Sequence, residues 1–241
     1  MRVLITGASG QVGRALQASK PADVDICALS HEELDIVDPA EVRQAVTAFA
    51  PAVVINTAAY TAVDRAESEA QLAMAINALG PHFLAETVRN IASARLIHVS
   101  TDYVFDGLRS EPHKPSDATH PMSVYGRTKL SGEVEILELL PKRSVVLRSA
   151  WIYGPDGKNF LLTMLRLMRE RGTVRVVTDQ RGTPTAASSV ARALWRAVEL
   201  PTLRGVLHWT DGGTASWYEF ACAIAEDALE IGLLKKPVKV T

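Results

Sequence analysis

Residues 2–13 read RVLITGASGQVG, a short apolar run that leads directly into three glycines at positions 7, 10 and 13. The run is typical of a buried strand, and the residues that follow have the spacing of an amphipathic helix. Glycines between a strand and a helix permit a tight turn, close approach of backbone N–H groups to a pyrophosphate, and close packing of the helix on the sheet. The stretch therefore predicts a dinucleotide site, with a plain glycine-rich turn as the alternative.

The same alternation continues along the chain. Apolar, β-branched runs occur at 25–29, 52–58, 95–101 and 144–149, and helical patterns lie between them at 12–19, 40–50, 70–90 and 125–140. Strands that are apolar on both faces and alternate with helices are typical of a parallel sheet covered on both sides. We predict a doubly wound, Rossmann-like α/β fold.

The expected division into domains follows from where this alternation loosens. Residues 1–150 should form the dinucleotide-binding domain, completed by part of 174–210. Residues 151–241 should form a smaller, partly helical substrate lobe that interleaves with it, with helices at 159–171 and 186–200 and a strand at 173–179.

Composition restricts the kinds of partner. The 241 residues are 47% hydrophobic, enough for a sizeable core, and the 26 basic and 27 acidic residues are mixed along the chain with a net charge of −1. We therefore expect no nucleic-acid or membrane partner. Cys27 and Cys222 form no disulfide framework, so we expect a cytoplasmic protein. No His, Cys and Glu cluster has metal-ligand spacing, and we predict no metal.

A tyrosine and a lysine four residues apart make the candidate catalytic pair. Tyr125 and Lys129 share one face of the predicted helix, and Thr101 ends the strand before it. Ligands of such folds bind at the carboxyl ends of the strands. Lys129 would lower the pKa of Tyr125 from its usual ~10, Tyr125 would act as the acid when hydride reduces a ketone, and Thr101 would bind the same oxygen. The alternative is a chance surface pair.

The choice of dinucleotide stays open at this level. The second predicted strand ends in Leu29, Ser30 and His31, with neither an acidic residue for the ribose of NAD nor a basic one for the phosphate of NADP. Asp35 followed by Ile36 could contact an adenine, or Asp35 could be a turn or cap residue.

Several motifs together resemble a known superfamily. The glycine spacing, NTAAYTAVD at 56–64, STDYVFDG at 100–107 and the Tyr-x-x-x-Lys pair are similar to those of extended short-chain dehydrogenases/reductases. Within that superfamily, TAVDRAES, STDYVFDG, VYGRTKLSGE, RSAWIYG and DQRGTPT, in that order, resemble the dTDP-4-dehydrorhamnose reductase family, and the resemblance extends from residue 3 to about 220. The resemblance implies reduction of the 4-keto group of dTDP-4-dehydro-L-rhamnose to dTDP-L-rhamnose for polysaccharide biosynthesis, with NADPH as cofactor and NADH as the alternative.

The resemblance also implies roles for individual residues. The catalytic group would be Thr101, Tyr125 and Lys129, which would also contact the cofactor. The other cofactor contacts would be Gly7, Gly10, Gln11, Val12, Gly13, Asp35, Ile36, Ala58, Ala59 and Tyr60. The substrate contacts would be Asp102, Tyr103, Trp151, Asn159, Gln180 and Arg181, with Trp151 as a core aromatic being the alternative. Arg148 is interpreted as structural.

Two other functions share these motifs. A nucleotide-sugar dehydratase or epimerase has the same pair, but a dehydratase commonly has an Asp-Glu pair after the threonine, whereas here Asp102 precedes Tyr103. A non-catalytic NADP-binding subunit, similar to the β subunit of methionine adenosyltransferase, is the second alternative. Similar proteins continue beyond the position of Thr241, so we expect the substrate lobe to be incomplete in this chain, and we expect a monomer or weak homodimer.

Overall fold

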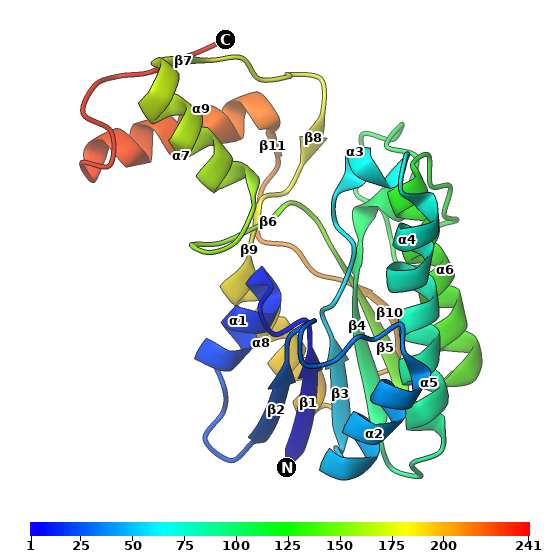
Figure 1. Cartoon of the computed structure of the whole chain (residues 1–241). Helices are drawn as coiled ribbons and strands as arrows, with labels where there is room; N and C mark the ends of the chain where they lie inside the picture. Colours follow the sequence, from blue (N-terminus) through cyan, green and yellow to red (C-terminus); the bar gives the residue numbers. More distant parts are fainter. The chain divides into compact units, whose positions relative to one another are not determined.

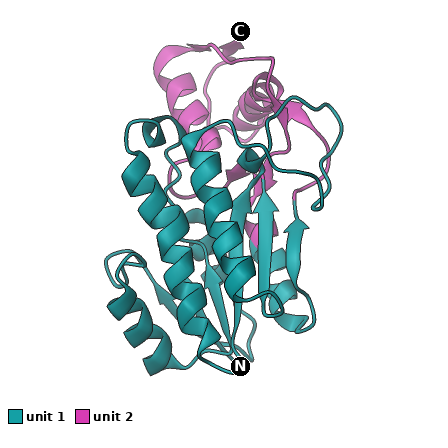
Figure 2. Ribbon diagram, turned by 90° about the vertical axis from the view of Figure 1, so that its right-hand side faces the viewer, with its two compact units in different colours: residues 1–149, 191–209 teal, residues 150–190, 210–241 magenta.

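The computed structural model describes residues 1–241 as two compact units (Figure 2). The first unit comprises Met1–Ser149 and Ala191–Trp209, and the second comprises Ala150–Val190 and Thr210–Thr241. The chain therefore leaves the first unit after Ser149, returns to it for residues 191–209, and leaves it again after Trp209.

A six-stranded parallel sheet forms the centre of the first unit. Its strand order is β10-β5-β4-β3-β1-β2, and every neighbouring pair is parallel. The predicted parallel fold is confirmed. The strands are β1 (Arg2–Thr6), β2 (Asp25–Leu29), β3 (Val53–Asn56), β4 (Arg95–Thr101), β5 (Ser144–Ser149) and β10 (Gly205–His208). The sequence did not predict β10, because this edge strand has only four residues and all are half-buried.

Helices cover both faces of this sheet (Figure 1). Helices α1 (Gln11–Ala18) and α8 (Ala187–Glu199) lie on one face, where the Trp195 indole donates to the Leu16 carbonyl of α1 at 3.3 Å. The opposite face carries α2 (Pro39–Phe49), α5 (Gly80–Arg89) and α6 (Val124–Leu139). This two-sided cover is the doubly wound arrangement that was predicted.

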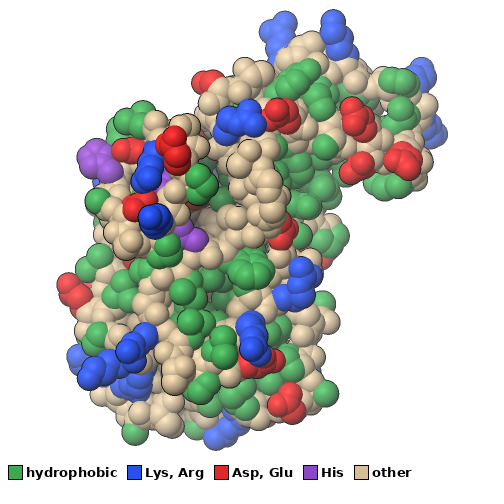
Figure 3. Space-filling view, turned by 180° about the vertical axis from the view of Figure 1, so that it is seen from behind, with side chains coloured by type: hydrophobic (Ala, Val, Ile, Leu, Met, Phe, Trp, Pro, Cys, Tyr) green, Lys and Arg blue, Asp and Glu red, His purple; other side chains and the backbone are tan.

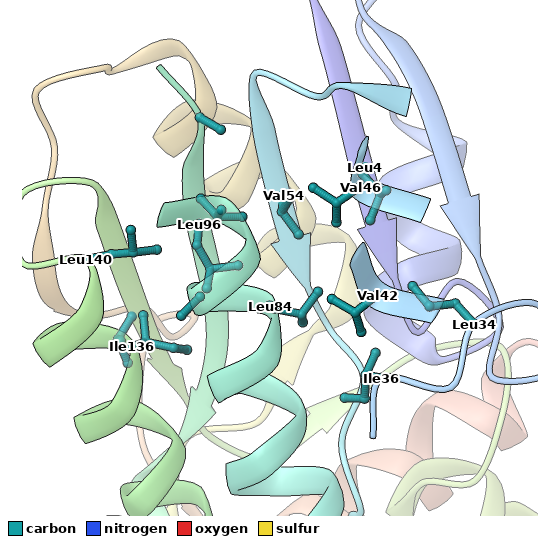
Figure 4. Close-up of a cluster of buried hydrophobic side chains, with 14 residues drawn as sticks. Leu4, Leu34, Ile36, Val42, Val46, Val54, Leu84, Leu96, Ile136 and Leu140 are labelled. Atoms are coloured by element: carbon teal, nitrogen blue, oxygen red, sulfur yellow. The ribbon is translucent and has the colours of Figure 1, made fainter. Parts of the chain in front are cut away.

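The main core packs between the sheet and α2, α5 and α6 (Figure 4). Aliphatic side chains of the strands face those of the helices there, which explains the apolar runs within the strands. Its buried members are Leu4, Leu34, Ile36, Val42, Val46, Val54, Leu84, Ala85, Val88, Ala94, Leu96, Ile136, Leu140 and Val146.

The helix predicted at 70–90 is divided in the structure. Helix α4 (Ala70–Met74) continues into a π-helical turn, η1 (Ala75–Leu79), and then into α5. Pro81 gives the physical reason, because a proline ring within an α-helix collides with the carbonyl four residues earlier, here that of Asn77. Two short elements complete this unit, α3 (Val63–Ala66) and the 3-10 turn η2 (Asp102–Val104).

The second unit has its own core between two helices, α7 (Phe160–Arg171) and α9 (Trp217–Glu230). Three small two-stranded sheets join its segments: β6 (Ile152–Tyr153) with β9 (Thr185–Ala186), β8 (Arg181–Gly182) with β11 (Ala215–Ser216), and β7 (Thr173–Val174) with β12 (Lys239–Val240). The predicted strand at 173–179 is wrong beyond Val174, since only its first two residues pair with β12.

The surface carries both charges. On the face shown in Figure 3, basic and acidic side chains are interspersed with apolar ones. None of the helices is both long enough and apolar enough to cross a bilayer.

Candidate active site

The glycine loop joins β1 to α1 as the sequence predicts. Gly7 has φ +71°, and a Cβ there would lie 2.6 Å from the backbone nitrogen of Ala58. A Cβ on Gly13 would lie 2.3 Å from the carbonyl oxygen of Gly7. Gly10 precedes α1 as its N-cap and offers no side chain to cap it, while Gln11 and Val12 begin the helix. The loop is thus a close-packed turn that leaves backbone N–H groups at the start of α1.

The loop after β3 lies beside this turn. β1 has β2 on one side and β3 on the other, so the chain order reverses here, and ligands of doubly wound folds bind at such a point. The Thr57 hydroxyl donates to the Thr6 carbonyl at 2.7 Å, and the adjacent Ala58 and Ala59 lead to Tyr60. The structure therefore brings the glycine loop together with the residues predicted to contact the adenosine and ribose.

Asp35 and Ile36 have structural contacts of their own. The Asp35 carboxylate accepts from the Val37 N–H at 3.0 Å, which is the turn role that the sequence left as one alternative. Ile36 is buried in the main core, and a Cβ on Gly80 would lie 2.5 Å from its Cδ1. Their predicted contact with an adenine stays a prediction.

Thr101 and Tyr125 meet at the carboxyl end of β4. Ser123 caps α6 by accepting from the Gly126 N–H at 3.0 Å, so Tyr125 lies in the first turn of the helix. A Cβ on Gly126 would lie 2.2 Å from the carbonyl oxygen of Tyr103, which shows how closely α6 approaches η2. The rings of Tyr103 and Tyr125 pack edge to face with centroids 5.4 Å apart, and the Thr101 side chain lies beside Tyr125.

The prediction that Lys129 lowers the pKa of Tyr125 is wrong. Burial raises the pKa of Tyr125, the bond to Thr101 lowers it, and the nearby Asp102 and Tyr103 raise it further. The physical reason is that the Lys129 amine is turned to other partners, donating to the Val99 carbonyl at 2.8 Å and lying 3.1 Å from the His98 Nε2. Tyr125 consequently keeps its proton at neutral pH.

Lys129 itself is only 2% exposed. Burial lowers its pKa to about 8, and the carboxylate of Glu133 one turn later acts in the opposite direction. Glu133 accepts from the Ser100 hydroxyl at 2.5 Å and forms a buried ion pair with Arg148 at 2.6 Å. These contacts give Arg148 the structural role that the sequence assigned to it.

Asp102 is a second perturbed group beside Tyr125. Its carboxylate accepts from the Thr101 hydroxyl at 3.1 Å. Burial raises its pKa to about 6, although hydrogen bonds from Thr101 and from the backbone of η2 act against that rise. A carboxyl with a raised pKa near a polar cluster is typical of functional sites.

The candidates in the second unit form contacts among themselves. Trp151 stacks on Trp217 with ring centroids 3.4 Å apart and has φ +47°, which is rare for a bulky side chain. Gln180 accepts from the Trp217 indole at 3.2 Å, and Arg181 lies 3.4 Å from the Glu219 carboxylate. Asn159 caps α7 by accepting from the Leu162 N–H. Their contact with a substrate stays a prediction.

Sequence reasoning missed two polar residues of the first unit, Asn77 and His98. Asn77, in the π-helical turn, accepts from the Tyr60 N–H at 2.8 Å and donates to the Thr128 hydroxyl at 3.1 Å. The only indication of this residue in the sequence was Pro81, four residues later. His98, fully buried in β4, contacts Lys129. Its signal in the sequence was a histidine between the apolar residues Ile97 and Val99. No group of three or more His, Cys, Asp or Glu side chains is placed to hold a metal.

Known proteins are similar in sequence to this chain over most of its length. The dTDP-4-dehydrorhamnose reductase of Aggregatibacter actinomycetemcomitans is 44% identical over 236 residues, covering 95% of this chain and 79% of that protein. A probable dTDP-4,6-dihydroxy-2-methyloxan-3-one 4-ketoreductase of Streptomyces antibioticus is 43% identical over 222 residues, covering 92% and 75%.

A solved structure is similar to this chain as well. The crystal structure of dTDP-4-dehydrorhamnose reductase from Bacillus anthracis in complex with NADP superimposes with a TM-score of 0.93 at 38% identity, covering 100% of this chain and 84% of that one. The RmlD substrate binding domain family matches residues 1–240. The chain belongs to that family.

Proposed function

We propose that this protein reduces the 4-keto group of dTDP-4-dehydro-L-rhamnose to give dTDP-L-rhamnose, with NADPH as the hydride donor and NADH as the alternative. The observation that carries the proposal is that Thr101 and the buried Tyr125 lie side by side at the carboxyl end of β4. That edge of the sheet also holds the glycine loop after β1. Relatives named as dTDP-sugar reductases and a neighbour that binds NADP support this choice.

The chemistry follows from the protonation of Tyr125. The nicotinamide supplies a hydride, with both electrons, to the carbonyl carbon, and the oxygen then carries negative charge. Thr101 donates a hydrogen bond to that oxygen, and Tyr125 gives it a proton. The raised pKa of Tyr125 suits this direction, because the phenol enters the reaction with its proton in place. In this proposal Lys129, one turn later on α6, binds the nicotinamide ribose.

Each unit has a separate part in this proposal. The first unit binds the dinucleotide through the glycine loop and Ala58, Ala59 and Tyr60. The second unit contributes contacts to the dTDP-sugar from Trp151, Asn159, Gln180 and Arg181. The protein works in the cytoplasm as a monomer or weak homodimer, with no nucleic-acid or membrane partner.

Simple reduction is favoured over the two alternatives by particular residues. A dehydratase needs a further acid and base to remove water, and Tyr103 stands where the glutamate of an Asp-Glu pair would be. A non-catalytic cofactor-binding subunit has no need of a threonine hydroxyl beside a buried tyrosine. Loss of NADPH absorbance with the dTDP-4-keto sugar, compared with cofactor binding alone, distinguishes turnover from binding.

The test replaces Tyr125 by phenylalanine, which removes the proton donor and little volume. We expect Tyr125→Phe still to bind NADPH but to lose at least about 100-fold in kcat, within the range for loss of an acid catalyst. Tyr218→Phe, on α9, is the matched control and should keep the wild-type rate. The assay follows oxidation of NADPH and, separately, NADH. A rate for Tyr125→Phe close to that of Tyr218→Phe would remove the assignment.

A further inference from the structure

A chain of buried hydrogen bonds runs across the sheet beneath α6 and ends at Lys129. Asn56 on β3 and His98 on β4 are register partners, and neither side chain is exposed. The Asn56 amide nitrogen lies 3.0 Å from the His98 Nδ1, and the His98 Nε2 lies 3.1 Å from the Lys129 amine. Thr6 on β1 begins the chain, donating to the Asn56 side-chain oxygen at 2.7 Å.

The direction of this chain is fixed by one backbone group. The Ala58 N–H donates to the Asn56 side-chain oxygen at 3.0 Å, and a backbone N–H can only donate. The oxygen of the Asn56 amide is therefore an acceptor, so its NH₂ group must face His98 as a donor. The His98 Nδ1 must then present a lone pair, and the hydrogen of the neutral ring must be on Nε2.

The hydrogen on the His98 Nε2 points at the Lys129 amine. An uncharged amine can accept that hydrogen while donating to the Val99 carbonyl, whereas an ammonium ion has no lone pair and would oppose one N–H with another. We propose that Asn56 and His98 are positioning residues for Lys129: they offer a hydrogen bond to its uncharged amine and none to its ammonium ion.

This inference gives Lys129 a specific part in the reaction. That part rests on the proposed reduction of the dTDP-4-keto sugar. When Tyr125 has given its proton to the substrate oxygen, the Lys129 ammonium gives up a proton that restores the phenol. A bridging hydroxyl or water carries this proton, because the Lys129 amine itself is turned to Val99 and His98. The amine that remains gains the hydrogen bond from His98, so release of the proton becomes easier, and the amine takes a new proton from solvent. The charged group that acts on Lys129 is Glu133, which the buried Arg148 neutralises. Burial already moves the pKa of Lys129 in the same direction.

The test reverses the direction of the chain with a nearly isosteric change. In Asn56→Asp the carboxylate still accepts from Ala58 and Thr6, but it also accepts from His98, so the ring hydrogen moves to Nδ1 and Nε2 becomes an acceptor for the ammonium. Long-range ¹H–¹⁵N NMR of the histidine rings reports the tautomer. ¹³C and ¹⁵N NMR of labelled lysine, assigned with Lys129→Met, reports the titration of Lys129.

We expect the hydrogen of His98 on Nε2 in the wild type and on Nδ1 in Asn56→Asp, with the Lys129 midpoint raised by at least about one pH unit in the variant. His98→Leu, which adds no charge, should raise the midpoint as well and serves if Asn56→Asp does not fold. Thr6→Val is the matched control: it removes a hydrogen bond from the same chain but leaves the Ala58 N–H in place, so tautomer and midpoint should not change.

Three results would overturn the proposal. These are a wild-type His98 with its hydrogen on Nδ1, a Lys129 midpoint that does not rise in either variant, and a Thr6→Val midpoint that moves as far as that of Asn56→Asp. All of these measurements use the protein without substrate. They can therefore succeed or fail whether or not the dTDP-4-keto sugar is reduced, which separates this inference from the proposed function.

Discussion

At the scale of single residues, Asp102 connects the site to the stability of the fold. Its folded-state pKa of about 6 lies above the ordinary value of 3.8, so the folded protein binds this proton more tightly than the unfolded chain. The carboxyl therefore favours the folded state below pH 3.8, and that contribution is lost as pH rises through about 6. At neutral pH Asp102 is ionised and destabilises the protein.

Asp102→Asn should remove this dependence. We expect the variant to be more stable than the wild type at pH 7, by on the order of 1–3 kcal/mol in the free energy of unfolding, and to show little difference at pH 4. Urea unfolding at both pH values measures the effect. Asp106→Asn, whose carboxylate accepts from the Leu108 N–H in an exposed loop, is a control for general effects of charge removal. A stability gain at pH 7 that persists unchanged at pH 4 would contradict the expectation.

At the scale of secondary structure elements, helix α6 is held by two close approaches. Gly126 faces the Tyr103 carbonyl, and a Cβ on Gly132 would lie 2.1 Å from the carbonyl oxygen of Asn77 in the π-helical turn. These contacts fix how closely α6 packs against η2 and the π-helical turn, and Lys129 lies between the two glycines. A helix of ordinary composition could form here but could not pack as closely.

Gly132→Ala should therefore disturb the site, although Gly132 is not one of the predicted site residues. We expect the added methyl group to lower the free energy of unfolding by about 1–3 kcal/mol, as for overpacking elsewhere, and to reduce kcat because α6 must shift. Gly212→Ala is the matched control, since a Cβ there would meet no atom within 4 Å. Thermal unfolding and turnover of the two variants give the comparison. Equal stability of both would show that the contact with Asn77 is unimportant.

At the scale of the whole molecule, the two units have separate cores with no shared residue. Leu84 is fully buried in the core of the first unit and Met168 is 2% exposed in that of the second. Each core is enclosed by helices of its own unit. The contacts assigned to the dinucleotide lie in the first unit alone.

Truncation of each core should then have different consequences. Leu84→Ala and Met168→Ala should each cost about 2–5 kcal/mol of stability. We expect Met168→Ala to keep its affinity for NADPH within about threefold, while faster amide exchange is confined to 150–190 and 210–241. Hydrogen exchange with mass spectrometry and NADPH titration measure both effects. Loss of NADPH binding in Met168→Ala would show that the units do not act separately.

The sequence determined the parts of this protein that depend on neighbours along the chain. The strand at 2–6 and the glycine loop after it follow from apolar runs and turn geometry, and the placing of Tyr125 and Lys129 on one helical face follows from a four-residue spacing. Local patterns carry this information because the hydrogen bonds of helices and tight turns join residues close in sequence.

Tertiary structure alone decided which partner each polar group has. The pairing of Asn56 with His98 joins residues 42 positions apart. The Lys129 amine lies against His98, and it does not lower the pKa of Tyr125 as the four-residue spacing predicted. The short strand β10 also depends on a distant neighbour, because it pairs with β5 about 60 residues earlier in the chain. Burial sets the cost of each unpaired donor or charge, and burial exists only after the strands and helices have packed.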